Sequence, residues 1–206
     1  MSKNTRTRIL LTAVAALLLV TMAVGGTLAW LTATSGPVEN TFKPSDIDVL
    51  INESPYTATT NTIDTTAAKV TANTGYQFVP GVNLPKDPEV TVDNDVDCYV
   101  FLKVTGTNWP SYAKYEIDST WTQLKGYTDV WYKEVAADAD VKSFNVLVGD
   151  QVTVDQTVTD MSESYEGGTA KNVKLTFNAY ACQKAPANDP VTAWTTYLGQ
   201  PAASNP

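Results

Sequence analysis

Three carboxylates stand at alternating positions, Asp93, Asp95 and Asp97, and this spacing could begin a calcium-binding loop. Oxygen ligands at the first, third and fifth positions open the loop of an EF-hand. The pattern then stops, because Cys98 stands where that loop needs glycine and Val104 where it needs a bidentate glutamate. The alternative is an Asp/Asn-rich hairpin turn, since these side chains hydrogen-bond to nearby backbone. We expect the turn, keep a weak calcium site as the alternative, and expect no other cofactor.

Histidine is absent from the chain. Without it, a His-liganded zinc site, a Ser-His-Asp triad and a Cys-His pair cannot be built. The two cysteines are too few for a zinc ribbon. The sequence therefore predicts that the protein is not an enzyme.

Cys98 and Cys182 each lie in an apolar run that is typical of a strand. In an oxidising compartment, two cysteines most simply form one disulfide. We expect a Cys98–Cys182 bridge, and the alternative is a pair of buried free thiols.

Aromatic side chains could form a surface on which a carbohydrate stacks. Trp131 and Tyr132 are neighbours on an expected strand and must point to opposite faces. Trp194 falls on the stripe of an expected helix and should pack on the sheet. Only Trp109, in a loop next to Tyr112, is expected to form an exposed aromatic site.

The first 29 residues have the three-part layout of a secretory signal peptide. Basic residues precede an apolar run over 9–24, and small residues follow it as far as Ala29. The run is about 16 residues, short of the roughly 20 that span a bilayer. We expect cleavage after Ala29, which makes Trp30 the mature N-terminus; the alternative is an uncleaved membrane anchor.

Charge limits the partners of the exported chain. The formal charge of the whole chain is −8, and removal of a basic signal peptide makes it more negative. An acidic chain repels phosphate backbones and anionic lipid headgroups. We expect no nucleic acid partner, and no stable membrane anchor after cleavage.

Short apolar and β-branched runs, separated by turn signals, predict an antiparallel β-sandwich over residues 46–206. Residues 30–45 are expected to form a mobile N-terminal arm, and 53–75 a surface excursion. The expected strands are 47–52, 76–79, 89–93, 98–105, 114–118, 121–124, 129–135, 144–148, 151–155 and 172–183.

A short helix is expected near the C-terminus. Asp189 is a typical N-cap residue, and Pro190 suits the first helical position. One stripe then follows at helical spacing, formed by Val191, Trp194, Tyr197 and Leu198.

Segments 25–32, 36–42 and 47–53 resemble the start of exported proteins that are processed by the dedicated signal peptidase SipW. This family includes the biofilm matrix fibre protein TasA and camelysin. Weaker similarity continues in the segments 78–81, 90–104, 121–125, 130–134 and 175–183. The resemblance implies a jelly-roll-like sandwich that follows a signal-peptide helix. It also implies a secreted protein of the extracellular matrix or cell surface of a Gram-positive bacterium. Camelysin is described as a metalloendopeptidase, but this chain has no His-Glu-x-x-His motif, so we do not expect peptidase activity.

The same resemblance implies self-association into fibres, with copies of the chain or related matrix subunits as partners and the signal peptidase as a partner during export. The mature arm would carry apolar Trp30, Leu31, Ala33 and Val38, and could complete a neighbour's sheet edge. Pro37 limits the continuous strand to about six residues, because it cannot donate to a ladder. The alternatives are an arm that folds back on its own sheet, and a monomeric surface binding module or adhesin, such as a glycan-binding one.

Overall fold

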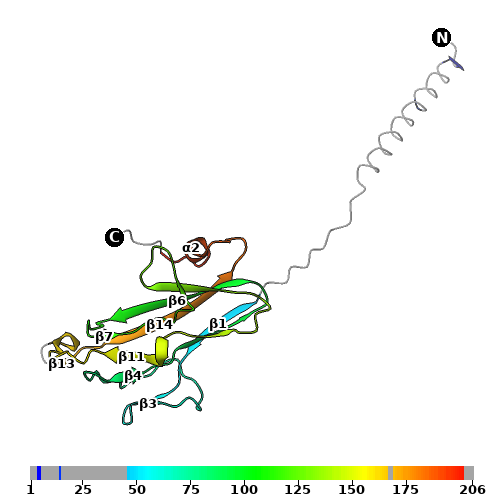
Figure 1. The fold of residues 1–206 in the computed structure, drawn as a ribbon. Helices are drawn as coiled ribbons and strands as arrows, with labels where there is room; N and C mark the ends of the chain where they lie inside the picture. Colours follow the sequence, from blue (N-terminus) through cyan, green and yellow to red (C-terminus); the bar gives the residue numbers. More distant parts are fainter. Residues whose placement is uncertain (1–3, 6–13, 15–45, 167–168, 202–206) are drawn as a thin grey trace. The chain divides into compact units, whose positions relative to one another are not determined.

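The computed structural model describes residues 4, 5, 14, 46–166 and 169–201 (Figure 1). The chain divides into two units, 1–43 and 44–206, and the description below concerns the second. The predicted cleavage site, Ala29 and Trp30, and the arm residues Leu31, Ala33 and Val38 lie outside the described residues. Within the described part of the chain, no helix has the length and apolar character to cross a membrane.

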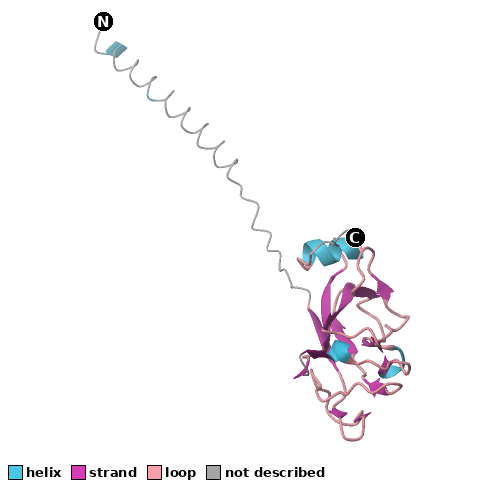
Figure 2. Cartoon of the chain, turned by 90° about the vertical axis from the view of Figure 1, so that its left-hand side faces the viewer, coloured by secondary structure: helices cyan, strands magenta, loops and turns pink. Residues whose placement is uncertain are grey.

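The predicted fold class is confirmed: the domain is an all-β antiparallel sandwich with one short C-terminal helix (Figures 1 and 2). Three sheets build it. The first contains β1 (Ile47–Asn52), β5 (Glu89–Asn94) and β10 (Ser143–Asn145), in the order β1-β5-β10. The second contains β14 (Lys174–Gln183), β6 (Cys98–Thr107), β9 (Val130–Val135) and β8 (Thr122–Gln123), in the order β14-β6-β9-β8. The third contains β4 (Asn83–Pro85), β11 (Gln151–Val154) and β7 (Ala113–Lys114), in the order β4-β11-β7.

Two short hairpins and several helical turns complete the domain. Two short hairpins are formed by β2 (Tyr56–Thr57) with β3 (Thr62–Ile63), and by β12 (Tyr165–Glu166) with β13 (Thr169–Ala170). The helical turns are η1 (Val148–Asp150), η2 (Ser162–Ser164), α2 (Pro190–Thr192) and the π-turn η3 (Ala193–Tyr197).

Strand β6 is the centre of the fold because both of its faces are buried. Its residues alternate between two hydrophobic clusters, as side chains on a strand must. Val100 and Leu102 belong to the core between the sheets, whereas Tyr99 and Phe101 belong to a second cluster on the outer face. A strand buried on both faces reads as a continuous apolar run, which is the sequence of residues 98–102.

The C-terminal helix covers the outer face of this sheet. The Asp189 side chain accepts a hydrogen bond from the backbone N–H of Thr192 at 2.7 Å, which confirms the expected N-cap. Trp194 is fully buried against Phe101 and Tyr180, with ring centroids 5.2 and 5.3 Å away. The prediction that Trp194 packs on the sheet is confirmed, but Tyr197 is 50% exposed. The π-turn that begins at Ala193 is wider than an α-helix and carries Tyr197 off the expected stripe.

Most long strands lie close to where the sequence predicts them. Two expected strands differ: 114–118 is reduced to β7 and an isolated bridge at Ile117, and 76–79 is wrong. Residues 76–79 form no strand; the strand in this part of the chain is β4, which begins after the turn at Gly81. In that turn, the Val82 N–H donates to the Val79 carbonyl at 3.0 Å. Segment 76–79 contributes side chains to a groove instead.

Candidate functional site: a groove beside the β14 edge

The outer edges of β1 and β14 have no strand partner among the described residues. The two strands lie side by side (Figure 1), and some of their Cα atoms are within 8 Å of each other. No ladder joins them, although a ladder would bring facing Cα atoms to about 4.5–5.5 Å. Both strands therefore keep unpaired backbone groups along this seam.

An additional strand cannot fit where β1 and β14 face each other. Neighbouring strands are about 4.7–4.9 Å apart, so the two flanking an inserted strand must stand roughly 9.5 Å apart. A groove of about 1010 Å³ lies beside the first half of β14, near the end of β1.

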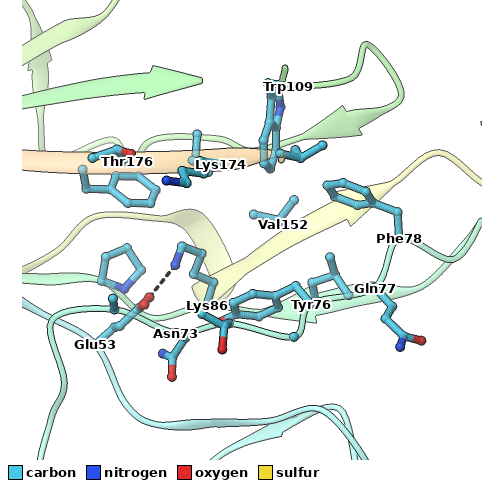
Figure 3. A pocket seen from close by; sticks show the side chains of 18 of the residues that line it. Glu53, Asn73, Tyr76, Gln77, Phe78, Lys86, Trp109, Val152, Lys174 and Thr176 are labelled. Atoms are coloured by element: carbon cyan, nitrogen blue, oxygen red, sulfur yellow. Dashed lines mark hydrogen bonds and ion pairs between the residues drawn. The ribbon is translucent and has the colours of Figure 1, made fainter. Parts of the chain in front are cut away.

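The groove is lined by apolar and polar side chains alike (Figure 3). Its lining includes residues from the end of β1, segment 71–79, β4 and residues 171–177. The large apolar side chains in it include those of Phe78, Leu84, Trp109, Val152, Leu175 and Phe177. Leu175 and Phe177 pack on the core but stay only partly buried. Their incomplete burial is what an edge strand with an unfilled neighbouring position shows.

Trp109 packs closely against β6 because residue 106 is glycine and has no side chain at the contact. A Cβ atom at Gly106 would lie 2.7 Å from the Trp109 Cβ, closer than real contacts allow. The Trp109 indole N–H donates to the Ala113 carbonyl at 3.0 Å, and its ring meets Phe78 edge-on at 5.7 Å. These contacts make Trp109 a wall of the groove.

Segment 71–79 forms the opposite wall and is held by one asparagine. The Asn73 side chain accepts from the Tyr56 N–H and donates to the Ser54 carbonyl, both at 2.8 Å. Tyr76 then stacks on Tyr56 with ring centroids 4.0 Å apart. Gly75 has φ +85°, a conformation that favours glycine, and allows the chain to turn into this position.

A buried ion pair closes one end of the groove. Lys86 and Glu53 are 2.5 Å apart and both are largely buried (Figure 3). The Lys86 ammonium also lies 5.3 Å from the Tyr76 ring centroid and 5.6 Å from that of Phe177. The neighbouring Asp87 carboxylate accepts hydrogen bonds from the Ser54 N–H and hydroxyl. The groove lining at this end therefore holds the Glu53–Lys86 pair, and Asp87 lies behind it, outside the lining.

The Tyr76 hydroxyl lies near these charges and is buried with no hydrogen-bond partner among the described residues. Burial raises the pKa of Tyr76, and the negative charges of Glu53 and Asp87 raise it further. The hydroxyl therefore stays protonated at neutral pH.

Two further lysines, Lys171 and Lys174, also line the groove, and neither lies within 4.0 Å of a carboxylate in the part of the chain that the structure describes. The Glu163 carboxylate accepts from the Ser111 N–H and hydroxyl at 2.6 and 2.7 Å. The groove lining therefore carries three lysines and one glutamate.

The three carboxylates proposed for calcium face different neighbours. Asp95 accepts from the Asp46 N–H and Asp97 from the Ala137 N–H, each at 3.0 Å, while Asp93 is exposed on β5. No group of three potential ligands that could hold a metal occurs among the described residues. Lys142 places its ammonium against this corner, 2.8 Å from the Asn94 carbonyl.

Residues 94–97 form no hairpin, which corrects the expected turn. Strand β5 pairs with β1 and β10, whereas β6 pairs with β14 and β9. The segment is therefore the corner where the chain passes from one sheet to the other. The hairpin prediction was wrong because two adjacent strands in a sandwich need not pair with each other.

The predicted disulfide is wrong in this structure, where Cys98 and Cys182 are free thiols. They lie on adjacent strands, but Cys98 is opposite Gln183 and Cys182 is opposite Tyr99. Paired residues point to one face and successive residues to opposite faces. Cys98 consequently faces the inter-sheet core and Cys182 the outer cluster.

Of the expected aromatic site, the structure leaves only part exposed. Tyr112 is buried, and its hydroxyl bonds to that of Ser164. Trp109 is half-buried and presents its ring to the groove and not to a flat surface. The sequence singled out Trp109 but missed the residues that surround it, notably Tyr76, Lys86 and Phe177. The adjacent unpaired strand was the only signal that could have found them.

No protein-family model, no curated protein and no solved structure matches this chain. The resemblance to SipW-dependent exported proteins stays a prediction. The site is therefore interpreted from its own geometry: a strand edge that is unpaired among the described residues, beside a groove with a mixed apolar and polar lining.

Proposed function

We propose that the protein is a secreted structural subunit that associates with copies of itself by strand donation. The N-terminal arm of one subunit adds to the β14 edge of the next and fills the groove. The observation that carries this proposal is the coincidence of a β14 edge without a strand partner among the described residues and a groove into which Leu175 and Phe177 are only partly buried. Strand addition takes affinity from main-chain hydrogen bonds and specificity from side-chain pockets.

The lengths of the donor and the acceptor agree. The groove runs along β14 from Lys174 to Phe177, about 13 Å of strand at 3.3 Å per residue. The arm offers six residues, 30–35, before Gly36 and Pro37 interrupt it. The donor segment 30–35 and the acceptor segment 174–177 are both short and allow few main-chain hydrogen bonds. Side-chain contacts of the arm inside the groove must therefore supply much of the affinity.

The arm and the groove lie at different ends of β1, and this separation favours an open chain of subunits over a closed pair. The arm joins the domain at the start of β1, whereas the groove begins at the other end of that strand, beside Ile51 and Glu53. The donor and acceptor surfaces are different, so the contact is heterologous. Heterologous contacts that do not close into a ring extend into filaments.

The proposal assigns the protein to the extracellular matrix or the cell surface, after cleavage behind Ala29. It assigns no catalytic role and no cofactor. The supporting observations are the signal-like segment, the lack of histidine and the acidic composition.

Monomeric binding is the second candidate, because Trp109 and the amide side chain of Gln77 both line the groove. An aromatic wall with amides suits a glycan. A glycan-binding module would leave the protein monomeric and would change Trp109 fluorescence when a soluble oligosaccharide is added.

Truncation separates these proposals. The mature chain beginning at Trp30 is compared with a chain beginning at Glu39, by electron microscopy over a series of concentrations. We expect filaments from the first chain only. Filaments from the shorter chain at the same concentration would exclude arm donation, and a failure of both chains to assemble would favour the binding module.

A further inference from the structure

Two chain connections meet at one corner of the sandwich. Residues 95–97 lead from β5 to β6, and residues 136–142 lead from β9 to β10. Each connection passes from one sheet to the other. The two contact each other directly, because the Ala137 N–H donates to the Asp97 carboxylate at 3.0 Å. The two sheets are therefore connected twice at this corner.

Oxygen atoms from both sides of the corner surround one ammonium group. The Lys142 Nζ donates to the Asn94 carbonyl at 2.8 Å and to the Ala137 carbonyl at 3.1 Å. The Asn94 side chain lies in the same corner, where its Nδ2 donates to the carbonyls of Val96 and Ala136. Asn94 is only 5% exposed, and its Oδ1 is buried with no hydrogen-bond partner among the described residues. Backbone and amide oxygens, and not a set of carboxylates, thus form this site.

The charge of the two connections also favours a cation. They contain four carboxylates, those of Asp95, Asp97, Asp138 and Asp140, and Lys142 is their only basic residue. The Lys142 ammonium lies within 4.0 Å of no carboxylate in the described part of the chain. The carboxylates therefore act on it through the local negative potential, while its direct contacts are carbonyls.

We propose that this corner is a site for a monovalent cation, and that the Lys142 ammonium is the cation that occupies it. The distances select the class of ion. Calcium takes oxygen ligands at 2.3–2.6 Å and magnesium at 2.0–2.1 Å, whereas the Lys142 nitrogen is 2.8 and 3.1 Å from its two carbonyls. Carbonyl oxygens also replace the hydration shell of potassium. Without the lysine side chain, the corner takes ammonium or potassium. This inference does not depend on strand donation.

Removal of the lysine tests the site in the full mature chain. Lys142→Ala opens the corner, and Lys142→Met removes the ammonium but keeps most of the apolar stem. Lys125→Ala, a change at an exposed lysine elsewhere on the domain, is the matched control. Urea unfolding is measured for each chain in potassium chloride and in tetramethylammonium chloride at equal concentration. Tetramethylammonium keeps the ionic strength the same but is too large for the corner and has no N–H donor.

We expect both Lys142 variants to be less stable than the parent in tetramethylammonium chloride, and to regain stability in potassium or ammonium chloride. The gain should saturate, since it comes from binding to the folded state. A site with a Kd of about 0.1 M raises the folding equilibrium constant about sixfold at about 0.5 M potassium. The parent and Lys125→Ala should have the same urea midpoint in the two salts, because the lysine already fills the site.

Three results would overturn the proposal. If Lys142→Ala is as stable as the parent in tetramethylammonium chloride, the corner needs no cation. If potassium stabilises the two Lys142 variants no more than it stabilises Lys125→Ala, the oxygens do not form a cation site. If both Lys142 variants stay unfolded in either salt, a free cation cannot replace the ammonium, and the assignment is wrong.

Discussion

At the scale of single residues, a missing Cβ atom shapes the groove and the strand register keeps the two thiols apart. The pocket wall at Trp109 exists because position 106 has no side chain. Cys98 and Cys182 cannot meet because their register differs by one residue. Neither feature is visible in the sequence, since residue type does not report register or a close approach between two residues.

Substitution of Gly106 by alanine should destabilise the domain by about 1–3 kcal/mol. The new methyl group must displace the Trp109 side chain, which lies 2.7 Å from the ideal Cβ position. Urea unfolding and Trp fluorescence measure the change. Thr107→Ala, on an exposed position of the same strand, should stay within about 0.5 kcal/mol; equal effects of the two variants would contradict the packing account.

Both thiols should be unreactive in the folded protein. Burial raises the pKa of Cys98 to about 11 and raises that of Cys182 as well, so little thiolate forms at pH 8. Thiol titration should detect both groups only after unfolding in denaturant. An intact mass two protons lower than that of the reduced chain would show a disulfide and contradict the structure.

At the scale of elements, the two longest strands were the easiest to predict. The doubly buried strand β6 follows an uninterrupted apolar run and the partly buried edge strand β14 a largely apolar one, and both were expected within a few residues. Segment 76–79 shows the limit: its aromatic residues have strand character but line a groove. Apolar residues are expected wherever a segment is half-buried. A half-buried segment does not have to pair with another strand, so its composition alone does not predict a strand.

Trp194→Ala should destabilise the domain by about 3–5 kcal/mol, because it removes a fully buried ring from the outer face of the sheet. Tyr197→Ala, three positions along in the sequence and half exposed, should change the free energy of unfolding much less. Denaturant titration of both variants tests whether the C-terminal helix is an integral layer. Similar small effects would show that the helix contributes little.

At the scale of the molecule, the domain is acidic and many of its carboxylates are fixed by local hydrogen bonds. The Asp64, Asp118, Asp155 and Asp160 side chains each accept from the residue two positions on. These bonds lower the pKa of each carboxyl. The turns of the sandwich therefore favour the ionised state.

Acid should weaken the fold for this reason. A carboxyl whose pKa is lower in the folded state contributes stability above its unfolded pKa of about 3.9 and loses it as pH falls through the folded pKa. The urea midpoint should be flat between pH 5 and 7, by this argument, and fall below about pH 4. A midpoint that rises on acidification would mean that repulsion among carboxylates, and not these hydrogen bonds, dominates.

Strand donation itself is most directly tested at the acceptor edge. Hydrogen exchange is measured for the amides of Lys174–Phe177 in the mature protein, before and after assembly, with the short edge strand β8 as an internal reference. We predict that outward-pointing amides of Lys174–Phe177 become protected on assembly and that those of β8 do not. Filaments in which exchange at Lys174–Phe177 is unchanged would contradict the account.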